Sequence, residues 1–164
     1  MRIALILLLA SLAPHSQAQT AATAVTESRD AALAYIGTAN FVVGRVGRDC
    51  LSLTGRGESA QDYAARWQQR NRPYIQASSK YLAQRLQEAS QQGGVTQRDA
   101  VQAELTRAVQ QAANKTLAGW LGQGDKAESC QRALRLIDQG GYDFGPGSAM
   151  YAELVSLLDW AQIK

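Results

Sequence analysis

The stretch from Ser28 to Leu53 places apolar or small residues at alternating steps of four and three. Side chains that recur at this spacing lie on one face of an α-helix. The members of this face are Ala32, Ile36, Ala39, Val43, Val46, Cys50 and Leu53. The spacing therefore predicts a long amphipathic helix over residues 28–53, with Cys50 on its buried side.

Cys50 and Cys130 are the two cysteines of the chain. In an oxidising compartment, an even pair of cysteines most simply forms one disulfide. In the chain-entropy model, a crosslink that closes so long a loop contributes roughly 4 kcal/mol to stability. Two separate buried thiols are the alternative. We expect the disulfide, and we expect it to join the first helix to the fourth.

The N-terminal residues have the layout of a secretory signal peptide. Arg2 precedes an apolar run over residues 3–13, and small residues follow at Ser16 and Ala18. A positive residue, a short apolar run and small residues before a cut are typical of such leaders, and the run is too short to span a bilayer core of about 30 Å. We expect cleavage after Ala18, which leaves residues 19–164 as a single helical domain in the periplasm or outside the cell. A short buried helix is the alternative.

Four further helices are predicted by the same periodicity and by capping residues. They are expected to cover residues 59–90, 96–121, 126–139 and 148–161, with N-caps at Ser59, Thr96, Asp125 and Ser148. Their expected inward faces are Tyr63, Trp67, Tyr74, Ser78, Leu82, Leu86 and Ala89; Val101, Leu105, Ala108, Ala112, Thr116 and Trp120; Ala127, Cys130, Leu134 and Ile137; and Tyr151, Leu154, Val155, Leu158 and Ala161. Pro73 is expected to kink or break the first of these helices near Asn71. The fold class predicted is an all-α, compact bundle of about five helices.

A stripe of small residues runs beside the apolar face of the first helix. Gly37, Asn40, Gly44 and Gly47 follow one another at steps of three, four and three. Each glycine inside a helix costs about 1 kcal/mol relative to alanine, and close approach of another helix would offset that cost. We expect the partner helix within the fold; a second subunit and a helix break at Gly44 are the alternatives.

One stretch mixes aromatic and basic residues and is the best candidate for a ligand or partner surface. It comprises Arg66, Trp67, Arg70, Arg72 and Tyr74. Arginines of this kind can bind phosphate or carboxylate groups of an anionic envelope component. An amphipathic helix with a solvated basic face has the same spacing and is the alternative reading.

The composition argues against several classes of function. The single histidine, His15, precedes the expected cut, so residues 19–164 hold no histidine general base or metal ligand. Loss of Arg2 with the leader lowers the formal charge from +3 to +2, which is not the basic footprint of a nucleic-acid binder. The glycines near Cys50 match neither a phosphate-binding loop nor a dinucleotide fingerprint. We therefore expect no cofactor, no metal, no nucleic-acid partner and no membrane span.

These features together favour a non-enzymatic envelope protein that works by binding a protein or an anionic envelope component. The layout of a leader followed by a small helical domain with one disulfide is similar to that of periplasmic immunity proteins and of acid-stress periplasmic chaperones. These two functions are the alternatives, and a small carboxylate-dependent hydrolase is the least favoured one. No spacing in the sequence indicates a homo-oligomer.

Overall fold

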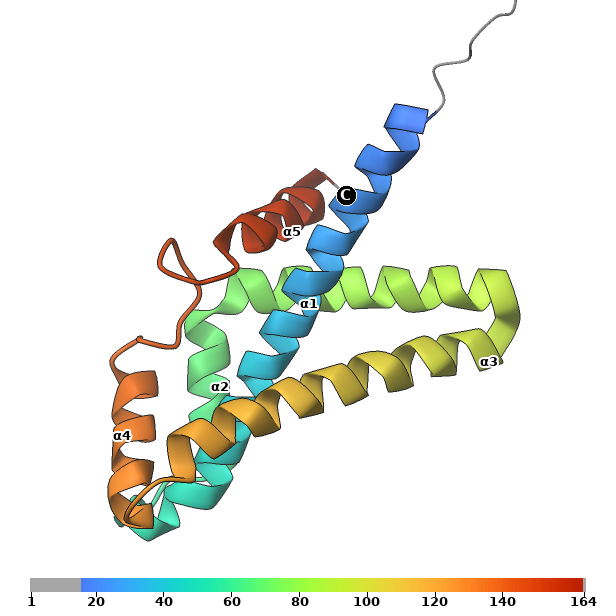
Figure 1. The fold of residues 1–164 in the computed structure, drawn as a ribbon. Helices are drawn as coiled ribbons and strands as arrows, with labels where there is room; N and C mark the ends of the chain where they lie inside the picture. The colour runs from blue at the N-terminus through green and yellow to red at the C-terminus, as the bar shows by residue number, and fades with distance from the viewer. Residues whose placement is uncertain (1–15, 164) are drawn as a thin grey trace, which may run out of the picture.

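The protein is described here by a computed structural model, which covers the backbone of residues 16–163 and the side chains of residues 26–162. Within this range the chain forms α1 (Ser16–Cys50), η1 (Ser52–Thr54), α2 (Ala60–Arg70), α3 (Arg72–Leu121), α4 (Lys126–Asp138) and α5 (Tyr151–Ile163) (Figure 1). The described residues contain five α-helices, one short 3-10 helix and no strand, so the predicted all-α class is confirmed. Most of the expected leader lies outside the described residues, and α1 already includes the expected cut after Ala18.

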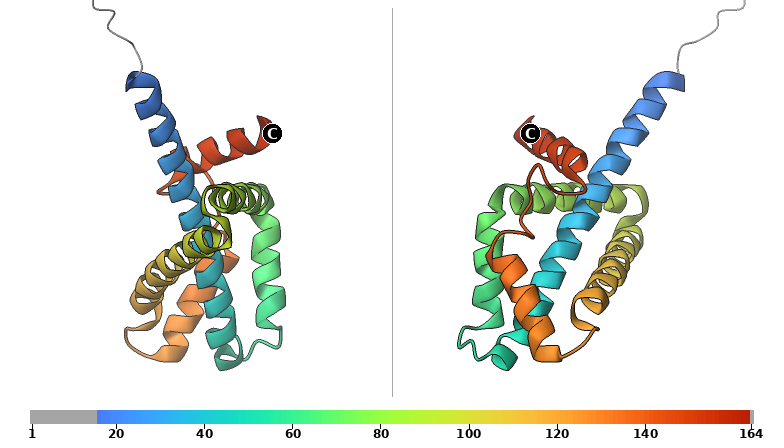
Figure 2. Two further views of the ribbon diagram at one scale, coloured as in Figure 1. Left: turned by 90° about the vertical axis from the view of Figure 1, so that its right-hand side faces the viewer. Right: turned by 60° about the vertical axis from the view of Figure 1, so that its left-hand side comes forward.

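Helix α1 is the central element of the bundle, because it contributes to both hydrophobic clusters. Its N-terminal half packs against α3 and α5 through Ala32, Leu33 and Ile36. Its C-terminal half packs against α2, α3 and α4 through a second set of residues, which includes Val42, Val43, Val46 and Cys50. Figures 1 and 2 show the other helices arranged around this one long axis.

The break expected near Asn71 is confirmed. Helix α2 ends at Arg70, and Asn71 leaves the helical region with φ −101° and ψ 17° before α3 begins. Pro73 then lies in the first turn of α3, where its missing N–H group has no intrahelical acceptor to lose. The proline therefore separates two helices that the sequence pattern joined as one.

Helix α3 is bent into two arms at Gly93 and Gly94, in the gap between the helices expected over residues 59–90 and 96–121. Both residues have non-helical dihedral angles, and Gly94 has a φ of 67°, which favours glycine. We call residues 72–92 the first arm and residues 95–121 the second arm. Figure 1 shows the two arms diverging from their shared tip, with α1 passing across both of them.

Two of the four expected N-caps are confirmed; Ser148 does not cap its helix, and Thr96 lies inside α3 and not at the start of a helix. The Ser59 hydroxyl accepts a hydrogen bond from the Asp62 N–H at 3.0 Å, and the Asp125 carboxylate accepts one from the Glu128 N–H at 3.0 Å. Ser148 does not cap α5 with its side chain, because its hydroxyl accepts the N–H of Gly145 instead. The chain makes a further turn after Ser148, and α5 begins at Tyr151.

The predicted buried faces are confirmed over most of the bundle, with corrections where a helix ends. Leu53 is 48% exposed, because α1 ends at Cys50 and η1 turns the side chain away from the core. Leu51 is the buried residue at this end of the helix. Tyr151 is also exposed, since it lies in the first turn of α5, whose buried residues are Leu154, Leu157 and Trp160.

The second arm of α3 also corrects the prediction, because its buried stripe shifts by one position. Ala108 and Ala112 are exposed, whereas Ala113 and Leu117 are buried. The expected stripe takes a step of three from Leu105 to Ala108, whereas the observed stripe continues from Leu105 in steps of four through Val109, which contacts Gly37 of α1, to Ala113 and Leu117. The arm therefore faces the core along a line that the sequence placed one residue too early.

The disulfide between Cys50 and Cys130 is confirmed, with an S–S distance of 2.03 Å and both residues fully buried. It joins the end of α1 to α4, as expected from the sequence. The bond lies beside η1, where the Thr54 hydroxyl donates to the Cys50 carbonyl oxygen at 2.9 Å.

Of the glycines in the expected small-residue stripe, Gly37 and Gly47 lie in close contact with another helical segment. A Cβ atom at Gly47 would lie 3.2 Å from Cδ1 of Tyr63 and 3.4 Å from the backbone of Ala60, so α2 approaches α1 closely there. A Cβ at Gly37 would lie 3.0 Å from a methyl group of Val109 on the second arm. Leaving aside the neighbouring backbone of α1, no atom of the described residues lies within 4 Å of the Cβ position at Gly44. The close packing expected at Gly44 is therefore not found within the described part of the chain.

Candidate functional site

The aromatic residues of the predicted ligand stretch point into the protein. Trp67 is fully buried, and its indole Nε1 donates to the Tyr142 carbonyl oxygen at 3.1 Å. Tyr74 is half-buried, and its ring meets that of Phe144 edge-on at 5.3 Å. The prediction that these two residues form a ligand surface is wrong for Trp67, because the helix that carries it packs this face against the loop after α4.

Arg70 and Asn71 hold the same loop, residues 139–150 between α4 and α5. The Arg70 guanidinium donates to the Asp143 carboxylate at 2.9 Å and to the Ile137 carbonyl oxygen at 2.8 Å. Asn71 is almost fully buried; its Oδ1 accepts the Phe144 N–H at 2.7 Å, and its Nδ2 donates to Asp143 at 3.1 Å. The stretch that looked like a ligand surface thus binds the protein's own loop.

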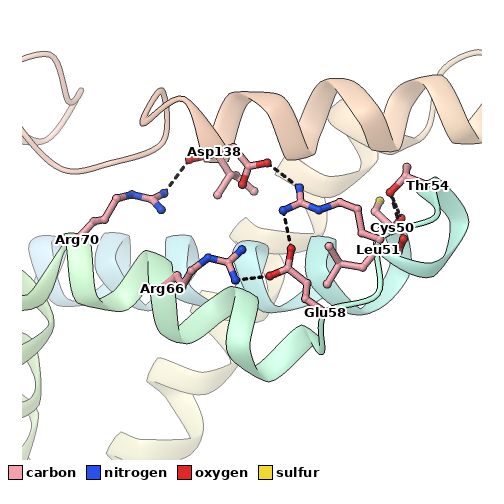
Figure 3. A network of polar contacts seen from close by, with 9 residues as sticks. Cys50, Leu51, Thr54, Glu58, Arg66, Arg70 and Asp138 are labelled. Carbon is pink, nitrogen blue, oxygen red and sulfur yellow. Dashed lines mark hydrogen bonds and ion pairs between the residues drawn. The ribbon is translucent and has the colours of Figure 1, made fainter.

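Arg66 belongs to a network of ion pairs that links α2 to α4, which we call the bridging network (Arg56, Glu58, Arg66 and Asp138). Arg56 donates to Glu58 at 2.5 Å and to Asp138 at 2.6 Å, and Arg66 forms an ion pair with Glu58. Figure 3 shows Glu58 and Arg66 beside α2, with Asp138 facing them from α4. Hydrogen bonds from Arg66, and after them from Arg56, hold the pKa of the Glu58 carboxyl below its usual value.

Tyr63 lies beneath this network. The guanidinium groups of Arg56 and Arg66 lie 5.3 and 5.6 Å from the centre of its ring, within cation–π distance. Burial raises the pKa of the Tyr63 hydroxyl well above its usual value, so the phenol stays neutral at physiological pH. Tyr63 therefore packs in the core beneath the bridging network.

Arg72 is the remaining member of the predicted surface. It lies exposed at the first position of α3, and within the described part of the chain it has no hydrogen-bond or ion-pair partner. The structure therefore does not bring the five predicted residues together: two rings point inward, two arginines bind protein carboxylates, and one arginine faces solvent alone.

A cleft between α1 and the two arms of α3 is the stronger candidate for a site, and we call it the hairpin cleft. Its volume is about 260 Å³, and side chains from three helical segments converge on it. Its apolar lining consists of Leu33 from α1, Leu82 from the first arm, and Val101, Leu105 and Ala108 from the second arm. The two arms diverge from their tip (Figure 1), and the second arm touches α1 closely at Gly37.

Three charged side chains also line the hairpin cleft. Asp30 accepts a hydrogen bond from the Tyr81 hydroxyl at 2.8 Å and pairs with Arg85 at 3.2 Å. Arg85 also reaches Glu88 at 3.4 Å. Glu104 is exposed on the second arm and has no ion-pair partner among the described residues. The cleft therefore combines an apolar lining with one uncompensated acidic group.

A second hollow, of about 460 Å³, lies between α1 and the loop after α4. It is larger than the hairpin cleft, but its lining is mainly the backbone of a glycine-rich segment. Its aromatic rings already pack against the protein: Tyr35 against Phe144 at 5.7 Å, and Tyr142 against Trp120 at 4.8 Å. Burial raises the pKa of the Tyr142 hydroxyl to about 12. Because these groups are engaged, the hairpin cleft is the better candidate.

The described residues contain no cluster of three or more histidine, cysteine, aspartate or glutamate side chains able to hold a metal ion. No helix in the same part of the chain has both the length and the apolar character that a membrane crossing requires.

Comparison with protein-family models, with curated proteins and with solved structures found no match to this chain. The chemistry of the site is therefore argued from its own residues.

Sequence reasoning placed Leu82, Val101, Leu105 and Ala108 on inward faces but did not identify a cleft among them. The glycine pair between the two apolar stripes could have indicated the cleft. A bend at these glycines brings the two stripes close to each other but keeps them from packing along their whole length. The acidic group at Glu104 carried no motif and became recognisable only beside these apolar residues.

Proposed function

We propose that this protein is a non-enzymatic binding protein, and that its partner docks in the hairpin cleft. The observation that carries this proposal is the open apolar cleft among α1 and the two arms of α3. Concave sites with an apolar lining and a few polar groups are the usual places where proteins bind partners and ligands.

We further propose that the protein is exported, with the leader removed after Ala18. The buried disulfide supports this, since such bonds persist in oxidising compartments such as the periplasm and the cell exterior. Mass spectrometry of the protein recovered from the periplasm and the medium tests the proposal. A mature chain that begins at Gln19 is expected, and a cytoplasmic chain that begins at Met1 would contradict it.

The docking proposal is tested by filling the cleft. Ala108→Phe adds a ring from an exposed position that lines the cleft, whereas Ala103→Phe adds the same ring to a different groove on the second arm. Partners crosslinked in the envelope fraction should be lost with Ala108→Phe and retained with Ala103→Phe. Circular dichroism and thermal midpoints of the two variants should match, and equal recovery of partners from both would discard the cleft.

An immunity or inhibitor protein is a special case of the same proposal, in which the partner is one toxin. That function predicts a single, tight partner in the crosslinked fraction, which is lost with Ala108→Phe.

An acid-stress chaperone is the second candidate function. It is favoured by ion pairs that join separate elements through carboxylates, such as Glu58 and Asp138 in the bridging network and Asp143 at Arg70. Protonation of Glu58 in acid would weaken its ion pairs with Arg56 and Arg66, and with them the link between α2 and α4. Protection of an aggregating client protein at acid pH, absent at neutral pH, is the expected result; no protection in acid would eliminate this function.

A further inference from the structure

We infer that the partner enters the hairpin cleft with one large apolar side chain that has a basic residue beside it. The inference rests on the proposed docking function and adds the chemistry of the partner. It combines the size of the cleft, the charges around it and the rigidity of its polar groups.

The size of the cleft favours a single side chain over a whole small molecule. Pockets that bury drug-sized ligands measure roughly 300–1,000 Å³, whereas this cleft measures about 260 Å³ and is open to solvent along its side. Protein partners commonly anchor a few large side chains in pockets of this kind, and these anchors supply most of the binding energy. The occupant is therefore a segment of a protein partner.

The charges that line the cleft are acidic in sum. Asp30 and Glu104 are opposed by Arg85 alone, and Arg85 is already bonded to Asp30 and to Glu88. Glu104 consequently remains without a counter-charge at the edge of an apolar surface. A basic residue in the partner would supply it.

No neighbouring base in the described part of the chain forms an ion pair with Glu104. Arg107, three residues later on the second arm, lines a different groove and has no ion-pair partner among the described residues. Arg98, two turns nearer the tip of α3, pairs with Asp99 at 2.8 Å. Arg29, the residue before Asp30 on α1, does not line the cleft. The chain carries a formal net charge of +3, so the acidic character here is a local property and runs opposite to that of the whole chain.

The two acidic side chains of the cleft differ in their contacts, and we assign them different roles for that reason. Asp30 is fixed by Tyr81 and Arg85, so it positions the walls of the cleft. Glu104 is free to reorient toward an incoming cation. Charges at the rim of an interface mainly select the partner and raise the association rate, so Glu104 acts as a selectivity determinant, while the leucines supply the affinity.

The test uses three series of short fluorescent peptides with a central phenylalanine flanked by lysine, glutamine or glutamate. Binding is measured by anisotropy at low and at high salt. We expect the lysine series to bind the wild type most tightly, with a preference that weakens in high salt. Glu104→Gln should reduce that preference by roughly 2- to 5-fold, the effect of one exposed ion pair. The control Glu128→Gln removes the same charge from α4 and should leave the preference unchanged.

The outcomes separate the two proposals. Equal binding of all three series, abolished by Ala108→Phe, would overturn the inference about the basic residue and leave the docking function standing; a preference for the glutamate series would do the same. Binding of no series, or binding that Ala108→Phe does not alter, would overturn both. A lysine preference that persists in Glu104→Gln would assign the selectivity to another residue and overturn the role given to Glu104.

Discussion

Asn71 shows how much of this fold depends on single polar side chains. It lies between α2 and α3, it is 1% exposed, and its amide bonds to three groups, of which two belong to the loop after α4. A buried polar group that loses its partner costs more than the bond itself contributes. Asn71 therefore fixes the loop as well as the junction between the two helices.

Asn71→Ala is expected to lower the free energy of unfolding by roughly 1–3 kcal/mol, because the Phe144 N–H group loses its acceptor. Urea unfolding followed by circular dichroism measures the change. Arg72→Ala, at the next and exposed position, is the matched control and should stay within about 0.5 kcal/mol of the wild type. Equal effects of the two substitutions would remove the structural role assigned to the Asn71 amide.

At the scale of elements, α1 shows how one helix carries glycines for different reasons. Gly47 lets α2 approach, since the Cβ position there is close to both the Tyr63 ring and the Ala60 backbone. Gly44 lies one turn earlier, where no described atom is near the Cβ position. The two glycines lie three residues apart on the same helix, but only at Gly47 does a neighbouring helix leave no room for a side chain.

Gly44→Ala is expected to raise the free energy of unfolding by about 0.5–1 kcal/mol, because alanine favours the helix and meets open space. Gly47→Ala is expected to lower it by roughly 1–3 kcal/mol, because the added methyl group pushes α2 away from α1. Chemical denaturation of both variants measures the difference. Stabilisation by the same amount in both would show that α2 can yield at Gly47, and would contradict the close-packing assignment.

At the scale of the whole molecule, α4 is held to the rest of the bundle by two kinds of link. The Cys50–Cys130 disulfide joins it to α1, and the bridging network joins its C-terminal end to α2. The disulfide acts chiefly on the unfolded chain, whereas the ion pairs act on the folded state and depend on pH. The two links therefore respond to different conditions.

Replacement of both cysteines by alanine is expected to lower the free energy of unfolding by roughly 2–5 kcal/mol. Equilibrium unfolding in urea measures the loss, and the wild type unfolded in the presence of a reductant should approach the variant. Both cysteines are fully buried, so the native protein should resist the reductant until it unfolds. Wild type and variant with equal stability would contradict a stabilising role for the bond.

Acid should weaken the bridging network. The pKa of Glu58 is lower in the folded than in the unfolded state, so its contribution to stability is present above the unfolded value of about 4.3 and is lost as the pH falls through the folded value. Glu58→Gln should therefore make the fall in unfolding free energy between about pH 5 and pH 3 shallower than in the wild type. Arg66→Gln should do so too, because it removes the first cause of the lowered pKa. An unchanged slope in both variants would contradict the coupling.

Much of the secondary structure could be predicted because it depends on neighbours in the chain. The Ser59 and Asp125 caps act on N–H groups three residues away, and the glycine pair in α3 changes the backbone where it stands. Only two cysteines are present, so an oxidised chain has one pairing available. Hydrophobic periodicity then located the helical segments, although residues 59–121 divide into α2 and α3 at Asn71 and not at the glycine pair. Errors in the expected buried residues appeared where helices end or drift, at Leu53, Ala108 and Ala112.

The use of each polar residue was decided by the tertiary structure alone. An arginine on a helix has the same local pattern whether it meets solvent or a carboxylate, and the partner of Arg70 lies 73 residues away in the sequence. The hairpin cleft likewise exists only where side chains of α1 and of both arms of α3 converge. The sequence by itself thus determined the helices, because they follow from contacts within a few residues, and it determined their covalent link, because only two cysteines are present. Only the packing of distant segments decided which side chains form contacts inside the fold and which remain available to a partner.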